Sequence, residues 1–229
     1  GKLTVRSVSE GAGIGGGQGG PGRFIYIKGG TVEAGSRSAG AGIGSGDYAG
    51  PGASEDTHDI EISGGSVIAW SNYAGAGIGG GRYSSGHDIS IIGGEVMAQG
   101  YWGAGIGGGM NGDGWNILIR DATLTAQSVP LYPNRDYDAV AINLSPAVAV
   151  GRGSNRTHYM SAMKNQEDLL YEENIKIGAS DGKSVRLSAT GWQWRPNQGT
   201  NKLGWGTTTE LLIGCVDLQR LSLPYAYNY

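Results

Sequence analysis

The sequence is poor in several residue types that mark common classes of protein. Its single cysteine, Cys215, excludes an intrachain disulfide and fits a reducing compartment or a bacterial export route without disulfides. Charged residues make up 16% and the net charge is −3, so there is no basic field for nucleic acid or an anionic membrane. No stretch is long and apolar enough to span a bilayer. Nucleic acid binding and membrane insertion are therefore not expected.

Glycine is the residue in excess, at 45 of 229, while seven prolines and the lack of a triplet period exclude collagen. The phrase Gly-Ala-Gly-Ile-Gly-Gly-Gly begins at residues 11, 40, 75 and 103, with Ser45 as its one substitution, so the starts are 29, 35 and 28 residues apart. A degenerate fifth copy lies at 147–153. A repeat with a period near 30 residues predicts a solenoid.

Apolar residues after each glycine phrase alternate with polar ones at a period of two, which indicates β-strands and not helices. The first strand of each repeat holds two isoleucines: Ile25/Ile27, Ile60/Ile62, Ile89/Ile91 and Ile117/Ile119. The second holds Val or Leu followed by Ala: Val32/Ala34, Val67/Ala69, Val96/Ala98 and Leu124/Ala126. Two strands and a glycine-rich third side, stacked at about 4.8 Å, bury these columns. The sequence therefore predicts an all-β, right-handed parallel β-helix.

We expect the β-helix over residues 1–190, with degenerate later coils, and a C-terminal cap of the same domain over 191–229. A short helix is predicted at 160–174, and loops are predicted at 50–58 and 128–138. The chain begins at Gly1 in what already reads as a strand, so we expect that a leader has been removed.

The glycine phrase and the phrase Ile-Ser-Gly-Gly-x-Val-x-Ala resemble the glycine-rich right-handed β-helix repeats of exported and surface proteins of gut-type bacteria, within the pectin-lyase-like class. The resemblance covers residues 1–126 closely and 139–190 more weakly. It implies a bacterial protein that is extracellular or at the cell surface. Related β-helices serve as polysaccharide lyases, glycosidases, carbohydrate binders and adhesins, so the resemblance leaves the function open.

The glycine phrase also satisfies the dinucleotide fingerprint Gly-x-Gly-x-x-Gly. That fingerprint needs a strand before it and a helix after it, whereas a strand pattern follows every copy here. No Gly-Lys-Ser/Thr follows, which excludes a P-loop. No cofactor is expected, with a divalent metal left as a possibility.

Two His-Asp pairs, His58-Asp59 and His87-Asp88, occupy equivalent sites of neighbouring repeats and should lie about 5 Å apart. They could hold a divalent metal, act as an acid and a base, or form an ordinary column of hydrogen bonds at a coil corner. Two carboxylates so close should raise one pKa unless the histidines or a cation compensate. The same columns also contain Arg23, Phe24, Trp115 and Asn116.

Tyr48 with Tyr83, and Tyr73 with Tyr101, lie at equivalent positions of neighbouring repeats and should form stacked columns at the coil edges. Such rings could stack on sugar rings or shield glycine backbone. Six residues are the candidate ligand-binding set: Tyr48, Tyr83, Tyr73, Tyr101, Trp70 and Trp102. The favoured hypothesis is a non-catalytic surface or secreted module that binds carbohydrate or adheres. The alternatives are a polysaccharide lyase or glycoside hydrolase, and a structural spacer of a larger surface protein.

Overall fold

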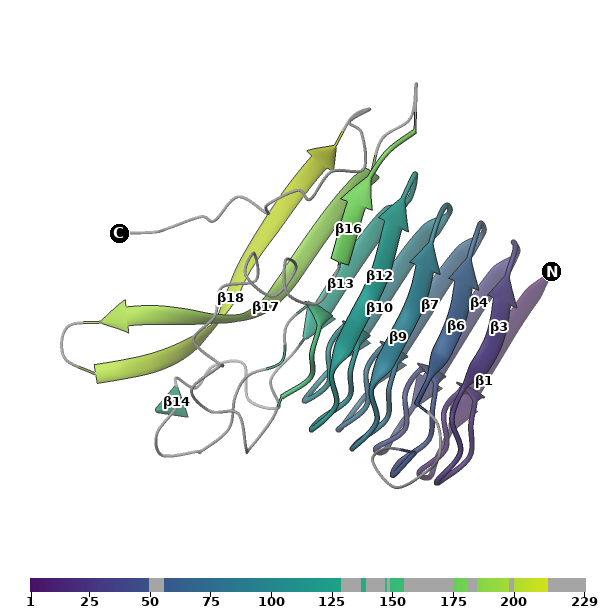
Figure 1. Cartoon of the computed structure of the whole chain (residues 1–229), viewed down its shortest axis with the longest axis horizontal. Coiled ribbons are helices and arrows are strands. Elements are labelled where there is room, and N and C mark those ends of the chain that lie inside the picture. The colour runs from purple at the N-terminus through teal and green to yellow at the C-terminus, as the bar shows by residue number, and fades with distance from the viewer. Residues whose placement is uncertain are drawn as a thin grey trace.

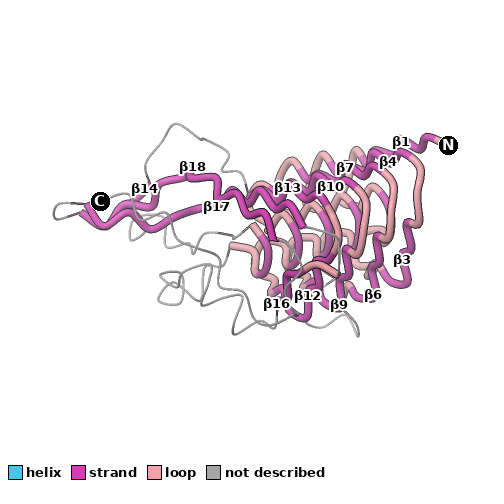
Figure 2. The backbone as a smooth tube through the Cα atoms, turned by 90° about the horizontal axis from the view of Figure 1, so that it is seen from above, coloured by secondary structure: helices cyan, strands magenta, loops and turns pink. Residues whose placement is uncertain are grey.

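The computed structural model describes residues 1–49, 56–128, 137–138, 147, 149–154, 175–180, 185–197 and 200–213. Over these residues the chain is all-β and winds as a right-handed parallel β-helix, as the sequence predicts (Figures 1 and 2). Each coil adds one strand to each of three parallel sheets, named A, B and C here. The predicted helix at 160–174 lies outside the described residues.

Strands that are far apart in sequence lie side by side in each sheet. Sheet A contains β1 (Lys2–Ser7), β4 (Thr31–Ser36), β7 (Ser66–Ser71), β10 (Glu95–Gly100), β13 (Thr123–Ser128) and β17 (Val185–Asn197), and is extended by β18 (Thr200–Ile213) and β14 (Tyr137–Asp138). Sheet B contains β2 (Ile14–Gly15), β5 (Ile43–Gly44), β8 (Ile78–Gly79), β11 (Ile106–Gly107) and β15 (Val150–Gly151). Sheet C contains β3 (Arg23–Ile27), β6 (His58–Ile62), β9 (Gly86–Ile91), β12 (Gly114–Arg120) and β16 (Ile175–Gly178).

The core consists of columns of identical or similar side chains that run along the solenoid. Strand register places Ile60 beside Ile89 and Ile62 beside Ile91, and all four side chains are buried. In sheet B, Ile78 pairs with Ile43 on one side and Ile106 on the other. Stacking lets each coil bury its apolar side chains against the next coil, which no coil can do alone. The predicted inward positions are confirmed.

Sheet B, the glycine wall, is the side of the coil where backbones approach most closely. Its second strand positions are glycines with φ between 126° and 138°, at Gly15, Gly44, Gly79, Gly107 and Gly151. A Cβ at Gly44 would lie 1.9 Å from the carbonyl oxygen of Gly79 in the next coil. Both the backbone conformation and the contact therefore require glycine.

The predicted fifth copy of the glycine phrase supplies β15, which pairs with β11, so this prediction is confirmed. Beyond it, β17 pairs in parallel with β13 and then forms an antiparallel hairpin with β18. The strand β17 crosses residue 191, where the predicted cap begins, and residues 214–229 lie outside the described part. Among the described residues there is no helix of the length and apolarity needed to cross a membrane.

Candidate functional site

The edge between sheets B and C is the corner at which each coil turns from the glycine wall into sheet C. One column of this edge contains Gly19, Tyr48, Tyr83 and Asn111, with left-handed φ values of 71°, 58°, 60° and 63°. Backbone hydrogen bonds tie the coils together here: Tyr48 N donates to Arg82 O at 2.9 Å, and Tyr83 N donates to Met110 O at 2.7 Å. The backbone thus places the two tyrosines on adjacent coils at the same position.

The rings of Tyr48 and Tyr83 stack, with centroids 4.9 Å apart and planes at 24°. The guanidinium carbon of Arg82 lies 4.7 Å from the centroid of the Tyr48 ring and 5.5 Å from that of Tyr83. Tyr48 remains 53% exposed. The predicted stacked pair is therefore present, and its use as a ligand-binding platform stays a prediction.

A fully buried carboxylate anchors this pair of rings. Asp47 accepts two hydrogen bonds from Arg82, with Nε to Oδ1 at 2.9 Å and Nη2 to Oδ2 at 2.6 Å. The hydrogen bond to Asp47 raises the pKa of the Arg82 guanidinium further above its ordinary value, although burial works in the opposite direction. We call Asp47, Tyr48, Arg82 and Tyr83 the tyrosine edge. This ion pair was not predicted from the sequence. Aligning the repeats does place Asp47 and Arg82, which carry opposite charges, at equivalent positions of adjacent coils.

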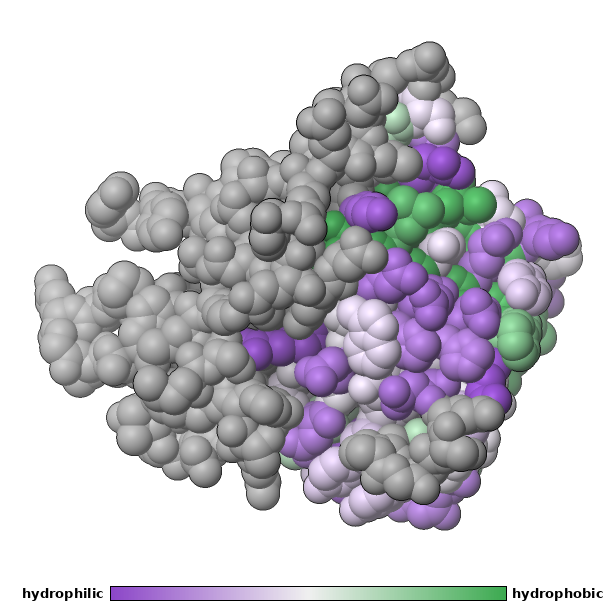
Figure 3. Space-filling view, in the orientation of Figure 1, coloured by the Kyte–Doolittle hydropathy of each residue, from purple (hydrophilic) through white to green (hydrophobic). Residues whose placement is uncertain are grey.

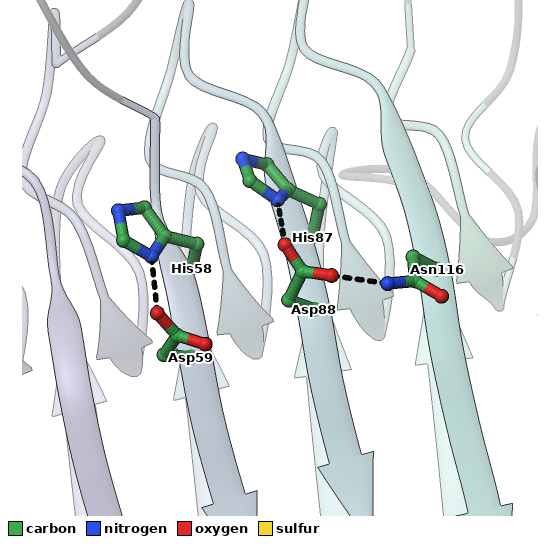
Figure 4. Close-up of polar contacts among 5 residues, drawn as sticks. All are labelled: His58, Asp59, His87, Asp88 and Asn116. Atoms are coloured by element: carbon green, nitrogen blue, oxygen red, sulfur yellow. Dashed lines mark hydrogen bonds and ion pairs between the residues drawn. The ribbon is translucent and has the colours of Figure 1, made fainter.

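The second candidate group, the His-Asp ladder, lies at the start of the sheet C strands (Figure 4). Nδ1 of His58 lies 2.7 Å from Oδ2 of Asp59, and Nδ1 of His87 lies 2.6 Å from Oδ2 of Asp88. The two imidazole rings stack with centroids 5.5 Å apart and planes at 19°. The structure therefore brings together all four residues of the predicted pairs, in the same arrangement on both coils.

The ladder continues through aromatic rings on both sides of the histidines. His87 stacks on Trp115 with centroids 4.3 Å apart and planes at 12°, and Phe24 meets His58 edge to face at 5.7 Å. Phe24 is 61% exposed. Sequence analysis placed Phe24 and Trp115 in these columns but did not predict the ring contacts, because side-chain torsions decide which neighbouring column a ring meets.

The aspartates of the ladder adopt left-handed backbone conformations, with φ of 56° at Asp59 and 51° at Asp88. Burial by itself would raise the pKa of Asp88, but hydrogen bonds from His87 and Asn116, together with the charges of His87 and His58, lower it below its ordinary value. The expected conflict between two carboxylates is thus relieved at Asp88 by the histidines, one of the two remedies considered above.

No group of three or more His, Cys, Asp or Glu side chains suited to a metal ion occurs within the described ranges. In the ladder, each carboxylate instead points at the Nδ1 atom of its own histidine. A closed site with four protein ligands is therefore not what these residues form.

The other four predicted aromatic residues lie at or near the edge between sheets A and B. The indole of Trp70 covers Gly35 of the preceding coil, since a Cβ on Gly35 would lie 2.1 Å from a carbon of that indole. Trp102 N donates to Tyr73 O at 3.0 Å, which sets Tyr101 and Tyr73 on adjacent coils. These described residues form no ring stack with one another, so the stacked column predicted for Tyr73 and Tyr101 is absent. At Trp70 the ring does shield glycine backbone.

Over β6, β9 and β12 the surface of the molecule is mainly hydrophilic, with a hydrophobic band toward the upper ends of these strands in this view (Figure 3). The outward column between the inward isoleucines confirms the predicted register, with Tyr26 beside Glu61, Glu61 beside Ser90 and Ser90 beside Leu118. Sheet C therefore presents a mixed polar and apolar strip beside the His-Asp ladder.

Comparison with known proteins identifies the repeats. The family model described as a β-helix repeat matches three segments, at residues 25–47, 60–82 and 89–110. No curated protein and no solved structure matches the chain. The stretches between the matched segments, 48–59 and 83–88, contain Tyr48, Tyr83 and the whole His-Asp ladder. The matched segments of the chain are therefore β-helix repeats. Tyr48, Tyr83 and the two His-Asp pairs lie between these segments, whereas the other candidate and ion-pair residues lie within them: Asp47, Trp70, Tyr73, Arg82, Tyr101 and Trp102.

Proposed function

We propose that this chain is a non-catalytic β-helix module that binds glycans at the tyrosine edge, as part of a secreted or surface protein of a bacterium. The observation that carries the proposal is the stacked, partly exposed pair of rings at Tyr48 and Tyr83. Sugar rings offer an apolar face and polar edges, and tyrosine matches both with its ring and its hydroxyl.

Backbone strain supports a use for these rings. Both tyrosines have φ near 60°, a conformation that costs a residue with a Cβ about 1–2 kcal/mol. Gly19 and Asn111 occupy the same column and are residue types that adopt it readily. Two bulky residues kept in a strained and partly exposed position point to a role for the side chain.

The ion pair beneath the rings favours binding by making the platform rigid. Arg82 is held by two hydrogen bonds to buried Asp47 and lies against both rings. Side chains that are fixed before binding lose little conformational entropy when a ligand arrives. The guanidinium group also keeps donors that Asp47 does not use, and these can reach sugar hydroxyls.

The two neighbours of the stacked rings along their column differ. The coil before Tyr48 has Gly19 at the equivalent place, so no side chain from that position covers the Tyr48 ring. In the coil after Tyr83 the equivalent residue is Asn111, which has an amide side chain. A glycan chain lying along the edge from Gly19 toward Asn111 would contact the tyrosine rings first and then the coil that carries Asn111.

The test compares two double variants on an array of plant, host-mucin and microbial polysaccharides. Tyr48→Ala with Tyr83→Ala should lower retention by about tenfold or more, because each ring contact is worth about 0.5–1.5 kcal/mol. The matched control, Tyr73→Ala with Tyr101→Ala, removes two tyrosines from the other edge and should retain glycan as the unmodified chain does.

Three outcomes contradict the proposal. Equal loss in both variants, or in neither, would remove the tyrosine edge as the binding site. New reducing ends or unsaturated products would favour the polysaccharide lyase or glycoside hydrolase. An absence of retention on every polysaccharide would favour the structural spacer.

A further inference from the structure

We propose that His58 and His87 form a partly exposed two-imidazole site for a borderline transition-metal ion of the class of Zn²⁺ or Cu²⁺. In this site Asp59 and Asp88 orient the rings and do not bind the ion. The proposal is independent of glycan binding, because it involves none of the residues of the tyrosine edge.

The orientation of the imidazoles is the first argument. An ionised carboxylate can only accept, so Nδ1 of each histidine donates its proton to the neighbouring aspartate, at 2.7 and 2.6 Å. This fixes the tautomer in which Nε2 carries the free lone pair. Histidines that bind metals through one nitrogen almost always donate the other N–H to a carboxylate, a carbonyl or water. Both coils show this arrangement.

Direction and accessibility are the second argument. Figure 4 shows the Nε2 atoms of His58 and His87 on the same side of the ladder, each pointing away from its aspartate. The two side chains are partly exposed, at 23% and 18%. The nearby carboxylates add negative potential that favours a cation. Imidazole nitrogen is a preferred ligand of zinc, copper and nickel.

The distance between the two imidazole rings requires a movement when one ion binds both. The ring centroids are 5.5 Å apart, whereas two nitrogens at about 2.0–2.1 Å from one ion can be no more than about 4.2 Å apart. The rings must therefore lean toward one another by rotation about their side-chain bonds. Water or an external donor would complete the coordination, which makes this an exchangeable site and not a closed structural one.

The stack on Trp115 supplies a reporter. His87 lies 4.3 Å from Trp115, so a paramagnetic ion on that imidazole should quench the indole fluorescence, and leaning of His87 toward His58 should alter the stack. The chain has six tryptophans, so the assignment needs the variant Trp115→Phe, which should remove the copper-dependent part of the quenching.

The experiment titrates Zn²⁺ into the tag-free whole chain by calorimetry. We expect one equivalent to bind, with affinity falling by tenfold or more in each of His58→Gln and His87→Gln. The control is His158→Gln, the third histidine of the chain, which should leave the affinity unchanged. Asp59→Asn with Asp88→Asn should weaken binding by about 10–100-fold, as for carboxylates that orient a ligating histidine.

Electron paramagnetic resonance of the Cu²⁺ complex should show two nitrogen ligands in the unmodified chain and one in either glutamine variant. Zinc binding that survives both histidine substitutions would overturn the proposal, and so would the absence of binding at millimolar zinc. Loss of glycan retention without loss of zinc binding, or the reverse, separates this site from the proposed function.

Discussion

The glycine wall and the tyrosine edge adjoin one another in the coils of Tyr48 and Tyr83, but the wall excludes side chains and the edge displays them. At Gly44 the wall has no room for a Cβ, because the next coil's carbonyl oxygen would be 1.9 Å away. Four residues later Tyr48 projects a half-exposed ring from a left-handed position that glycine fills in the first coil. The wall sets the spacing of the coils, and the edge uses that fixed spacing to align rings and charges.

The matched repeat segments follow the same division. They include β4, β5, β7, β8, β10 and β11, together with the isoleucine pairs of β3, β6 and β9 in sheet C. They stop at residues 47 and 82, just before the two tyrosines, and resume after the aspartates of the ladder. The matched segments thus contain the wall-forming strands and the ion pair of Asp47 with Arg82, whereas the two tyrosines and the His-Asp pairs lie outside them. Substitutions should reveal the same separation in their effects on stability.

The largest effect should come from Gly44→Ala. The new Cβ would clash with backbone of the next coil, and φ of 138° is a conformation that alanine rarely adopts. We expect a loss of more than about 4 kcal/mol in the free energy of unfolding, or failure to fold. Urea denaturation followed by circular dichroism measures it.

The control for this substitution is Gly17→Ala, the last glycine of the first copy of the phrase. A Cβ there meets nothing within 4 Å, and we expect a change within about 0.5 kcal/mol. If both alanine variants lose the same stability, close approach of the coils is not the reason for glycine in the wall.

An intermediate effect should come from Arg82→Ala at the tyrosine edge. The substitution leaves the carboxylate of Asp47 fully buried without its bidentate partner. Since the Arg82 side chain is 24% exposed, we expect a cost near the lower limit for broken buried pairs, about 2–3 kcal/mol. Adding Asp47→Asn should recover part of the loss, because it removes the uncompensated charge.

A surface ion pair provides the comparison for Arg82. Arg6 lies 2.6 Å from Glu33 on sheet A, with side chains 49% and 27% exposed. Arg6→Ala should cost no more than about 1 kcal/mol. Equal losses in Arg82→Ala and Arg6→Ala would mean that burial of Asp47 does not set the strength of its ion pair.

Sequence alone predicted the parts of this molecule that depend on periodicity. The inward columns, such as Ile60 and Ile89, follow from alternation at a period of two, and the glycine wall follows from the repeated phrase. Side-chain contacts at the corners of the coils could not be predicted from periodicity alone. The stack of Tyr48 and Tyr83 could be predicted because both residues share one column, whereas the Tyr73 and Tyr101 stack was predicted on the same ground and is absent.

The two pairs of tyrosines differ in the groups that fix the orientation of their rings. At Tyr48 and Tyr83 a left-handed backbone and the guanidinium of Arg82 hold both rings together. No comparable group holds the rings of Tyr73 and Tyr101 among the described residues. Column position follows from sequence, but the torsions of a side chain depend on neighbours from other columns, and these become visible only in three dimensions.

The smallest effect should be the acid dependence of the His-Asp ladder. The folded-state pKa of Asp88 lies below the ordinary value of 3.8. Between the two values the unfolded chain binds more protons than the folded one, so the contribution to stability is complete above pH 3.8 and is lost as the pH falls through the folded-state pKa. The side chain of Asp88 is 41% exposed, so solvent screening keeps the effect small. The gap between the denaturation midpoints of the unmodified chain and Asp88→Asn should therefore be constant at higher pH and should close as the pH falls below 3.8. A gap that stays constant as the pH falls below 3.8 would mean that the hydrogen bonds from His87 and Asn116 do not hold Asp88 in its ionised form.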